Sequence, residues 1–243
     1  MKLDILKSLN AERNARRAAV VITNEATGEQ RLVKAADVAK DPLRELIEKH
    51  IRSGKSGMEE DTPQGKVFVT VHVPAPRIVV TGAVHISQAL APIAKILGYD
   101  VTIVDPRTAF ASPERFPDVK VIAEWPDVAL PPLGVDRYTA FVALTHDPKI
   151  DDPALTHALQ RDCFYIGALG SRKTHGRRLE RLKGQGFSDA DLARIHAPIG
   201  LNIGAVSPAE IAIAIMGEIT ARLRQGPDKP SAKAPEKTLE KAS

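Results

Sequence analysis

Cysteine is almost missing from this chain of 243 residues, which contains a single one, Cys163. One cysteine excludes an internal disulfide and gives no support to a secreted, oxidising setting. Cys163 stands just before a predicted strand, so we expect it to be a small buried apolar residue rather than a nucleophile or a sulfur carrier.

Long apolar runs are missing as well. No stretch approaches the roughly 20 apolar residues that cross a bilayer. The N-terminal segment MKLDILKSLNAERNARR contains acids and has no apolar core of the signal-peptide kind. We therefore expect a cytoplasmic protein without a membrane span.

Aromatic residues are scarce, at 4% of the chain, whereas hydrophobic residues reach 43%. These values predict an aliphatic core of ordinary globular size. The net charge is +4, but part of it lies at the two ends of the chain, and no basic stripe is interleaved with aromatic residues. Nucleic acid is therefore not an expected partner.

Residues 1–73 have the pattern of a small α+β domain. Apolar residues at helical or alternating spacing predict, in chain order, a helix at 2–17, strands at 18–23 and 29–34, a helix at 42–53 and a strand at 66–73. The glycines and proline between 53 and 66 predict a loop. No motif of chemical significance occurs in this part of the chain.

Residues 74–226 alternate between short apolar runs and helical patterns. Predicted strands lie at 77–81, 101–105, 120–124, 139–145 and 164–169, and predicted helices at 86–97, about 152–161, 172–183, after Ser188 and after Ser207. This alternation predicts an α/β fold with a doubly wound, parallel, Rossmann-like sheet of strand order 3-2-1-4-5. Residues 227–243, rich in Pro, Lys and Ala, predict a disordered tail.

The turn after the first strand of this sheet is the first candidate ligand site. A dinucleotide-binding turn needs three glycines, but here only Gly82 is present, and Val84 and Ser87 take the other two places. The helix that follows still offers N–H groups to an anion. Asp105 ends the second strand, where a ribose-binding carboxylate would stand. The pattern disfavours a standard NAD(P) site and leaves open a turn that binds nothing.

The segment Thr145-His146-Asp147 follows the fourth strand of the sheet. In a doubly wound sheet this edge borders the ligand crevice, and His85 and Asp105 should project from the same edge. An imidazole beside a carboxylate can hold a ligand or move a proton. We expect no catalytic metal site here. The alternative is that His146 and Asp147 only cap the next turn.

A basic helix start follows the fifth strand. The residues of interest are Gly170, Ser171, Arg172 and Lys173, with Arg177 and Arg178 further along the helix. Glycine, a hydroxyl and cations at a helix N-terminus suit a phosphate group. Cations in the first turn also oppose the helix dipole, which favours an anionic partner over a merely solvated face.

The last candidate segment, residues 198–205, contains Gly200 and Gly204 among apolar residues. It precedes a helix with a strong start signal, Ser207-Pro208-Ala209-Glu210. We expect an ordered loop at the sheet edge, which either contacts a ligand or only packs.

Taken in order, these segments resemble the Rossmann-like domain of the XdhC/CoxI family over about residues 76–226. The matching pieces are Gly82 to His85, Asp105, Thr145 to Asp147, Gly167 to Arg172, Pro198 to Gly204 and Pro208 to Ala212. Val84 departs from the family's usual second glycine. The family's N-terminal Gly-Gly-Cys segment has no counterpart either, because residues 1–73 contain no cysteine. A divergent or shortened N-terminal region is therefore expected.

The resemblance implies a maturation factor without turnover of its own. Such a factor binds molybdenum cofactor, as molybdopterin or in a cytosine dinucleotide form, and assists its insertion into an apo-molybdoenzyme of the xanthine dehydrogenase, aldehyde oxidoreductase or CO dehydrogenase type. A cysteine desulfurase and a second copy of the chain are further partners that it suggests. The expected cofactor-binding residues are Gly82, His85, Asp105, His146, Asp147, Gly170, Ser171, Arg172, Lys173, Gly200 and Gly204. The alternatives are an NAD(P)-linked oxidoreductase and a nucleotide-sensing regulatory module.

Overall fold

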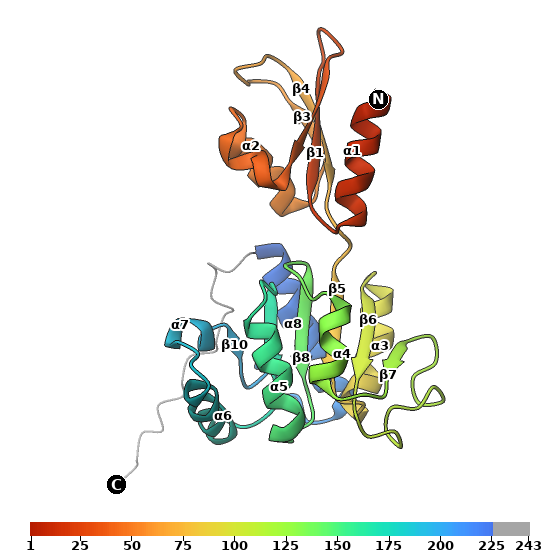
Figure 1. Cartoon of the computed structure of the whole chain (residues 1–243), viewed down its shortest axis with the longest axis vertical. Helices are drawn as coiled ribbons and strands as arrows, with labels where there is room; N and C mark the ends of the chain where they lie inside the picture. Colours follow the sequence, from red (N-terminus) through yellow and green to blue (C-terminus); the bar gives the residue numbers. More distant parts are fainter. Residues whose placement is uncertain (226–243) are drawn as a thin grey trace. The chain divides into compact units, whose positions relative to one another are not determined.

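The computed structural model describes residues 1–225, which form two compact units (Figure 1). The first unit is Met1–Pro74, and the second begins at Ala75. The tail predicted at 227–243 lies outside the described residues. Within them, no helix has both the length and the apolar character that a membrane span requires.

The first unit is an antiparallel sheet with helices on both faces, as predicted for a small α+β domain. Its elements are α1 (Leu3–Asn14), β1 (Ala19–Asn24), β2 (Gln30–Lys34), a 3₁₀ helix η1 (Ala35–Lys40), α2 (Arg44–Ser53), β3 (Gly57–Glu59) and β4 (Val67–His72). The strand order is β2-β1-β4-β3.

Alternation along β1 explains how this sheet is covered. Ala19 and Val21 pack in a cluster with α1, whereas Val20 and Ile22 pack in a cluster that includes Ile47 of α2. Successive side chains of a strand point to opposite faces, so one apolar strand serves two cores.

One prediction for this unit was wrong. The segment between α2 and β4 is not all loop, because β3 pairs with β4 through Gly57 opposite Val69 and Glu59 opposite Val67. Three residues are too few to show an alternating pattern among the surrounding turn residues.

The second unit is a parallel sheet of the predicted doubly wound kind. Its elements are β5 (Arg77–Thr81), α3 (His85–Ile96), β6 (Asp100–Val104), β7 (Lys120–Ile122), α4 (Pro126–Leu133), β8 (Thr139–Ala143), α5 (Pro148–Leu159), β9 (Tyr165–Ala168), α6 (Arg172–Gly184), α7 (Asp189–Leu192), β10 (Ile195–His196) and α8 (Pro208–Gln225). The strand order is β10-β9-β8-β5-β6-β7. The predicted order of five strands is confirmed, and β10 adds an edge.

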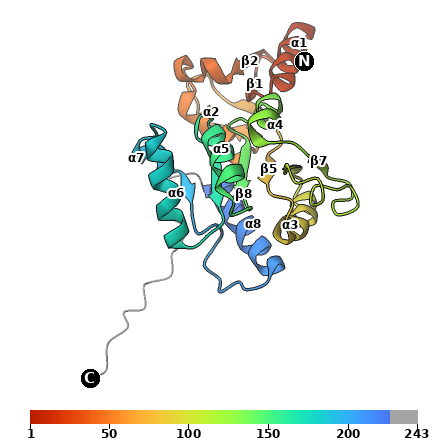
Figure 2. The ribbon, with the colours of Figure 1, turned by 60° about the horizontal axis from the view of Figure 1, so that its bottom comes forward.

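Helices cover both faces of this sheet (Figure 2). Ile78 and Val80 of β5 pack in a cluster with residues of α3 and α8. Val79, between them, belongs to the opposite cluster, which holds residues of α4, α5 and α6. The chain moves outward from β5 in one direction and from β8 in the other. The carboxyl ends of β5 and β8 therefore form the switch point where such sheets bind ligands.

Two helices depart from the prediction. α4 was not predicted, because Pro131 and Pro132 lie inside it and proline opposes a helix interior. α5 begins at Pro148 rather than near residue 152, because Asp147 is its N-cap. The earlier start brings Asp151 into the first turn of α5.

Candidate functional site

The turn after β5 packs directly against the segment after β8. Gly82 has φ of +115°, and a Cβ atom there would lie 2.9 Å from Cγ2 of Thr145. The N–H of Leu144 donates to the carbonyl of Thr81 at 2.9 Å. The first two candidate segments are therefore neighbours at the switch point, and only glycine allows this approach.

The N–H groups of the Gly82 turn are already bonded within the protein. Gly82 donates to the last carbonyl of β6 at 2.9 Å. Ala83 donates to Oδ2 of Asp105 at 2.7 Å, and Val84 donates to Oγ of Ser87 at 2.8 Å. A pyrophosphate needs such donors free. Internal hydrogen bonds, in addition to the Val84 side chain, therefore close this turn to a dinucleotide.

Asp105 is fully buried and holds that turn in place. Besides the bond from Ala83, it accepts Nε of Arg107 at 2.9 Å and Nη2 of Arg107 at 2.7 Å. Burial alone would raise the pKa of Asp105, but the bonds from Arg107 and from the backbone outweigh burial and leave the pKa below its ordinary value. Direct contact between Asp105 and a ligand stays a prediction, and this geometry favours a positioning role.

Arg107 interacts with acidic residues on both sides of the switch point. Its pKa is raised, first by the hydrogen bonds to Asp105 and further by attraction to Asp147 and Asp151, which follow β8. Its guanidinium also lies over the ring of Phe110, 4.6 Å from the ring centroid. The structure thus places acidic groups from both sides of the switch point around one partly exposed cation.

His146 and Asp147 differ in what they offer to a ligand. Asp147 caps α5, because its Oδ1 accepts the N–H of Lys149 at 2.9 Å. His146 is exposed, and its backbone has φ of +64°, a left-handed conformation that costs a non-glycine residue about 1–2 kcal/mol. His85 begins α3 and is also exposed. The exposed imidazole of His146 is the side chain of this segment best placed to contact a ligand.

Asp151 and Arg178 form a buried pair behind His146. Asp151 accepts Oγ1 of Thr145 at 2.6 Å and the N–H of His146 at 3.1 Å, and lies 3.8 Å from Nη2 of Arg178. Nη2 of Arg178 also donates to the carbonyl of Leu169 at 2.8 Å. Burial raises the pKa of Asp151 and lowers that of Arg178. This pair fixes the His146 segment to α6.

The predicted basic turn starts α6 as expected. Ser171 is the N-cap, and its Oγ accepts the N–H of Thr174 at 3.2 Å. Arg172 and Lys173 are exposed. Gly170 has φ of +134°, and a Cβ there would lie 3.2 Å from the side chain of Thr174. The turn is well formed, and its role in anion binding stays a prediction.

The loop before α8 is held by a buried carboxylate. Glu218 of α8 accepts the N–H of Gly200 at 2.8 Å and the hydroxyl of Tyr165 at 2.6 Å, and lies 2.9 Å from Nδ1 of His196. A Cβ at Gly200 would come within 3.0 Å of the α8 backbone, whereas one at Gly204 would meet nothing within 4 Å. Gly200 is therefore needed for packing, and Gly204 is not.

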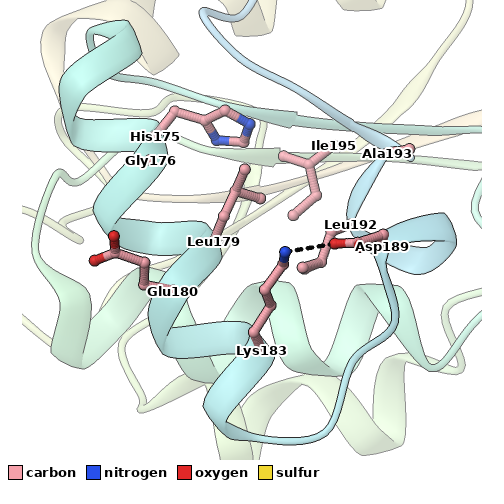
Figure 3. Close-up of a pocket in the computed structure, with 9 residues that line it drawn as sticks. All are labelled: His175, Gly176, Leu179, Glu180, Lys183, Asp189, Leu192, Ala193 and Ile195. Atoms are coloured by element: carbon pink, nitrogen blue, oxygen red, sulfur yellow. Dashed lines mark ion pairs between the residues drawn. The ribbon is translucent and has the colours of Figure 1, made fainter.

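A cavity of about 400 Å³ opens on the flank of α6 that faces α7 (Figure 3). Leu179 and Ile195 line it, and an ion pair of 2.6 Å joins Lys183 and Asp189 beside it. Nδ1 of His175 is buried and has no hydrogen-bond partner within residues 1–225, and burial lowers the pKa of His175. This cavity combines apolar walls with paired charges, so it is poorly suited to an anion.

Comparison with known proteins identifies the unit that carries these residues. Residues 78–219 match the family described as the XdhC Rossmann domain. The chain belongs to the XdhC family. The predicted family is confirmed, and the matched range contains every candidate residue from Gly82 to Gly204.

Three curated relatives are similar to this chain over 154–156 residues each. The chain is 36% identical over 155 residues to the uncharacterised protein YqeB of Escherichia coli (strain K12). It is 31% identical over 156 residues to the molybdenum cofactor insertion chaperone PaoD of the same organism. It is 29% identical over 154 residues to a protein of Bacillus subtilis (strain 168) that is named as a probable subunit of xanthine dehydrogenase.

The matches cover different shares of the proteins compared. The three alignments span 63–64% of this chain but only 28%, 43% and 44% of the relatives, respectively. A solved structure described as a xanthine dehydrogenase from Bacillus halodurans aligns with a TM-score of 0.66 at 22% identity. It covers 94% of this chain and 66% of the solved one, and at that identity it supports the XdhC fold alone.

The sequence prediction missed three charged residues of this XdhC domain. Asp151 was outside the predicted helix, whose start was placed too late. Arg107 gave no signal, because an arginine two residues after a strand is ordinary. Arg181 was visible as a helical neighbour of Arg177 and Arg178, since residues three and four apart share a face. Among the described residues, no three His, Cys, Asp or Glu side chains gather as a metal-binding group.

Proposed function

We propose that this chain is a maturation factor that binds molybdenum cofactor as cargo and assists its insertion into an apo-molybdoenzyme. The observation that carries the proposal is the 31% identity, over 156 residues, to PaoD, which is named a molybdenum cofactor insertion chaperone. The expected clients are enzymes of the xanthine dehydrogenase, aldehyde oxidoreductase or CO dehydrogenase type. A cysteine desulfurase and a second copy of the chain are further proposed partners.

The crevice suits binding better than turnover. The carboxylates behind it already accept hydrogen bonds within the protein. Asp105 accepts from Arg107 and from the Ala83 N–H. Asp151 accepts from Thr145 and from the His146 N–H. A group that moves a proton in a reaction must reach the substrate, and these two do not. What remains accessible is the imidazole of His146 and a cationic face of α6, which can orient an anionic cargo.

An NAD(P)-linked oxidoreductase is the less favoured function. Its pyrophosphate would need the N–H groups of Gly82, Ala83 and Val84, which are all donated within the protein. Its ribose would need Asp105, which is buried. The cargo is therefore expected to approach from the β8 and α6 side, as molybdopterin or in its cytosine dinucleotide form.

We expect His146→Gly to reduce cargo binding without loss of stability. Glycine adopts a positive φ without strain, so the free energy of unfolding should stay the same or rise by up to about 1 kcal/mol. Loss of the imidazole should lower both the pterin retained by the purified protein and the activation of a co-expressed client. Chemical denaturation and fluorescence of the oxidised pterin measure the two quantities.

Asp118→Gly is the matched control for this experiment. Asp118 is exposed and also has a positive φ, of +61°, but it lies in the loop before β7, where its carbonyl accepts Nζ of Lys95 at 3.2 Å. It should show the same stability change with normal retention and activation. Equal retention by wild type and His146→Gly, or no pterin on the wild-type protein, would contradict the proposal.

A further inference from the structure

A second, smaller cavity lies on the opposite flank of α6 from the one in Figure 3. Its volume is about 200 Å³. One wall is formed by α6, through Thr174, Arg177, Arg178 and Arg181, and the other by the β8–α5 segment, which includes His146 and Asp151. The four residues of α6 are spaced at i, i+3, i+4 and i+7, so they share one face of the helix.

The charges around this cavity favour an anion. Three guanidinium groups line it against one carboxylate, that of Asp151. Asp151 is buried, and its oxygens already accept hydrogen bonds from Thr145 and from the N–H of His146. Arg181 is held by Asp152 at 2.5 and 2.9 Å.

Arg177 has a different environment from Arg181. It is exposed, and within residues 1–225 no ion pair joins it to an acid. An unpaired cation at the mouth of a cavity repels the cations inside it unless an anion lies between them. Arg177 is therefore the arginine of this cavity whose positive charge no carboxylate within residues 1–225 balances, so a bound anion would interact with it directly.

Arg178 is a buried residue of the cavity wall whose hydrogen-bonding capacity is not all used by the described residues. Its side chain is 2% exposed, and one nitrogen, Nη2, donates to Leu169 at 2.8 Å. Among the residues that the structure describes, Nε and Nη1 have no hydrogen-bond partner. A buried donor without a partner costs about 1–3 kcal/mol, and more when the group is charged, so native proteins rarely keep one without a reason.

Size and chemistry narrow the class of anion. Sites that enclose a whole ligand usually measure about 300–1,000 Å³, so a cavity of about 200 Å³ fits an end group. Guanidinium groups match the oxygens of a phosphate, and the N-terminus of α5, at Pro148, adds a favourable dipole. We propose that this cavity binds a phosphate group, the anionic end of a ligand whose remainder lies in the crevice beside His146.

This site differs from the one that the sequence indicated. The sequence placed the anion contacts at Gly170, Ser171, Arg172 and Lys173, at the start of α6, and named Arg177 and Arg178 only as further cations of that helix. The cavity instead lies along the face of α6 from Thr174 to Arg181. That it binds phosphate follows from the cavity alone. That the phosphate is part of the molybdenum cofactor rests on the proposed function.

Calorimetric titration of inorganic phosphate into the purified full chain, in chloride buffer, tests the site. Arg177→Gln removes one exposed cation and should weaken phosphate binding about tenfold or more, the effect of losing one charged hydrogen bond. Arg137→Gln is the matched control, because Arg137 is an exposed arginine of the same unit before the amino end of β8. It should bind phosphate as the wild type does.

Each outcome of the titration either supports or overturns the proposed phosphate site. Saturable binding that Arg177→Gln weakens and Arg137→Gln leaves intact supports the site. Absence of saturable binding by the wild type, or equal weakening in both variants, overturns it. Arg178→Lys keeps a charge but loses the guanidinium, and if it folds it should bind phosphate still more weakly than Arg177→Gln; unchanged binding by this variant overturns the role of Arg178.

Pterin retention by the same variants separates this inference from the proposed function. If Arg177→Gln loses both phosphate binding and pterin retention, the occupant of the cavity is the phosphate of the cargo. Phosphate binding without any pterin on the wild-type protein keeps the site as a binder of free phosphate and overturns the proposed function. Normal retention by an Arg177→Gln variant that has lost phosphate binding also points to free phosphate. Pterin retained by a wild-type protein that does not bind phosphate keeps the function and overturns the site.

Discussion

Asp151→Ala is expected to lower the free energy of unfolding by about 3–5 kcal/mol, the cost of leaving a buried charge without its partner. Asp151 and Arg178 are each 2% exposed, so neither can reach water when the other is removed. The substitution also takes an acceptor from Thr145 and from the N–H of His146. Urea denaturation at neutral pH measures the change.

The neighbouring residue provides the control for that prediction. Asp152 pairs with Arg181, whose side chain is 39% exposed and can be solvated when its partner is lost. Asp152→Ala should therefore cost no more than about 1 kcal/mol. The double variant Asp151→Ala with Arg178→Met should recover part of the loss, because a buried pair is often replaced by apolar groups at little cost. Similar losses for Asp151→Ala and Asp152→Ala would contradict the assignment of a buried pair.

The parallel sheet could be predicted because its strands leave a strong pattern. Runs such as Ile78–Val80 and Ala140–Ala143 are apolar on both faces, which is typical of strands covered by helices on both sides. The order of five strands then follows from the rule for doubly wound sheets. β10 could not be found in this way, because it pairs with β9 only at Ile195 and His196.

The sequence of α4 contains start and stop signals for a helix, but prolines inside the helix concealed them. It has Pro126 at its first position and Gly134, with φ of +56°, at its end, which is the usual placement of these two residues. Pro131 and Pro132 in its last turns hid the pattern. Eight residues leave too few other positions to offset two prolines.

The sequence could predict which edge of the sheet brings the candidate residues together, but not their hydrogen-bond and ion-pair partners inside the protein. Gly82 and Thr145 were expected at one edge, and the structure brings them into contact. The sequence could not show that Asp105 is bonded to Arg107, since an acid at a strand end can face the crevice or the interior. It also could not show that Arg178 is buried, because arginine is rarely buried without a partner.

The internal bonding of Asp105 gives the crevice its shape. Arg107 and the Ala83 N–H hold its two oxygens, so the carboxylate links the turn after β5 to the loop after β6. Arg115 of the same loop donates to the carbonyl of Ala83 at 3.0 Å. Asp105, directly after β6, and two arginines thus keep the turn in the conformation that packs against Thr145.

Asp105→Asn should therefore lower the free energy of unfolding by about 2–3 kcal/mol at neutral pH, because charge-assisted hydrogen bonds are lost. The loss should not be larger, because the partly exposed Arg107 can be solvated when its partner is neutral. The folded pKa of Asp105 is below its ordinary value of 3.8, so its contribution is fully present above that value and disappears as the pH falls through the folded pKa. The stability difference between wild type and variant should stay constant from pH 7 to about pH 5 and shrink below pH 3.8. Asp100→Asn, at the exposed start of β6, should show no such difference. A difference between wild type and Asp105→Asn that grows as the pH falls would contradict the pairing with Arg107.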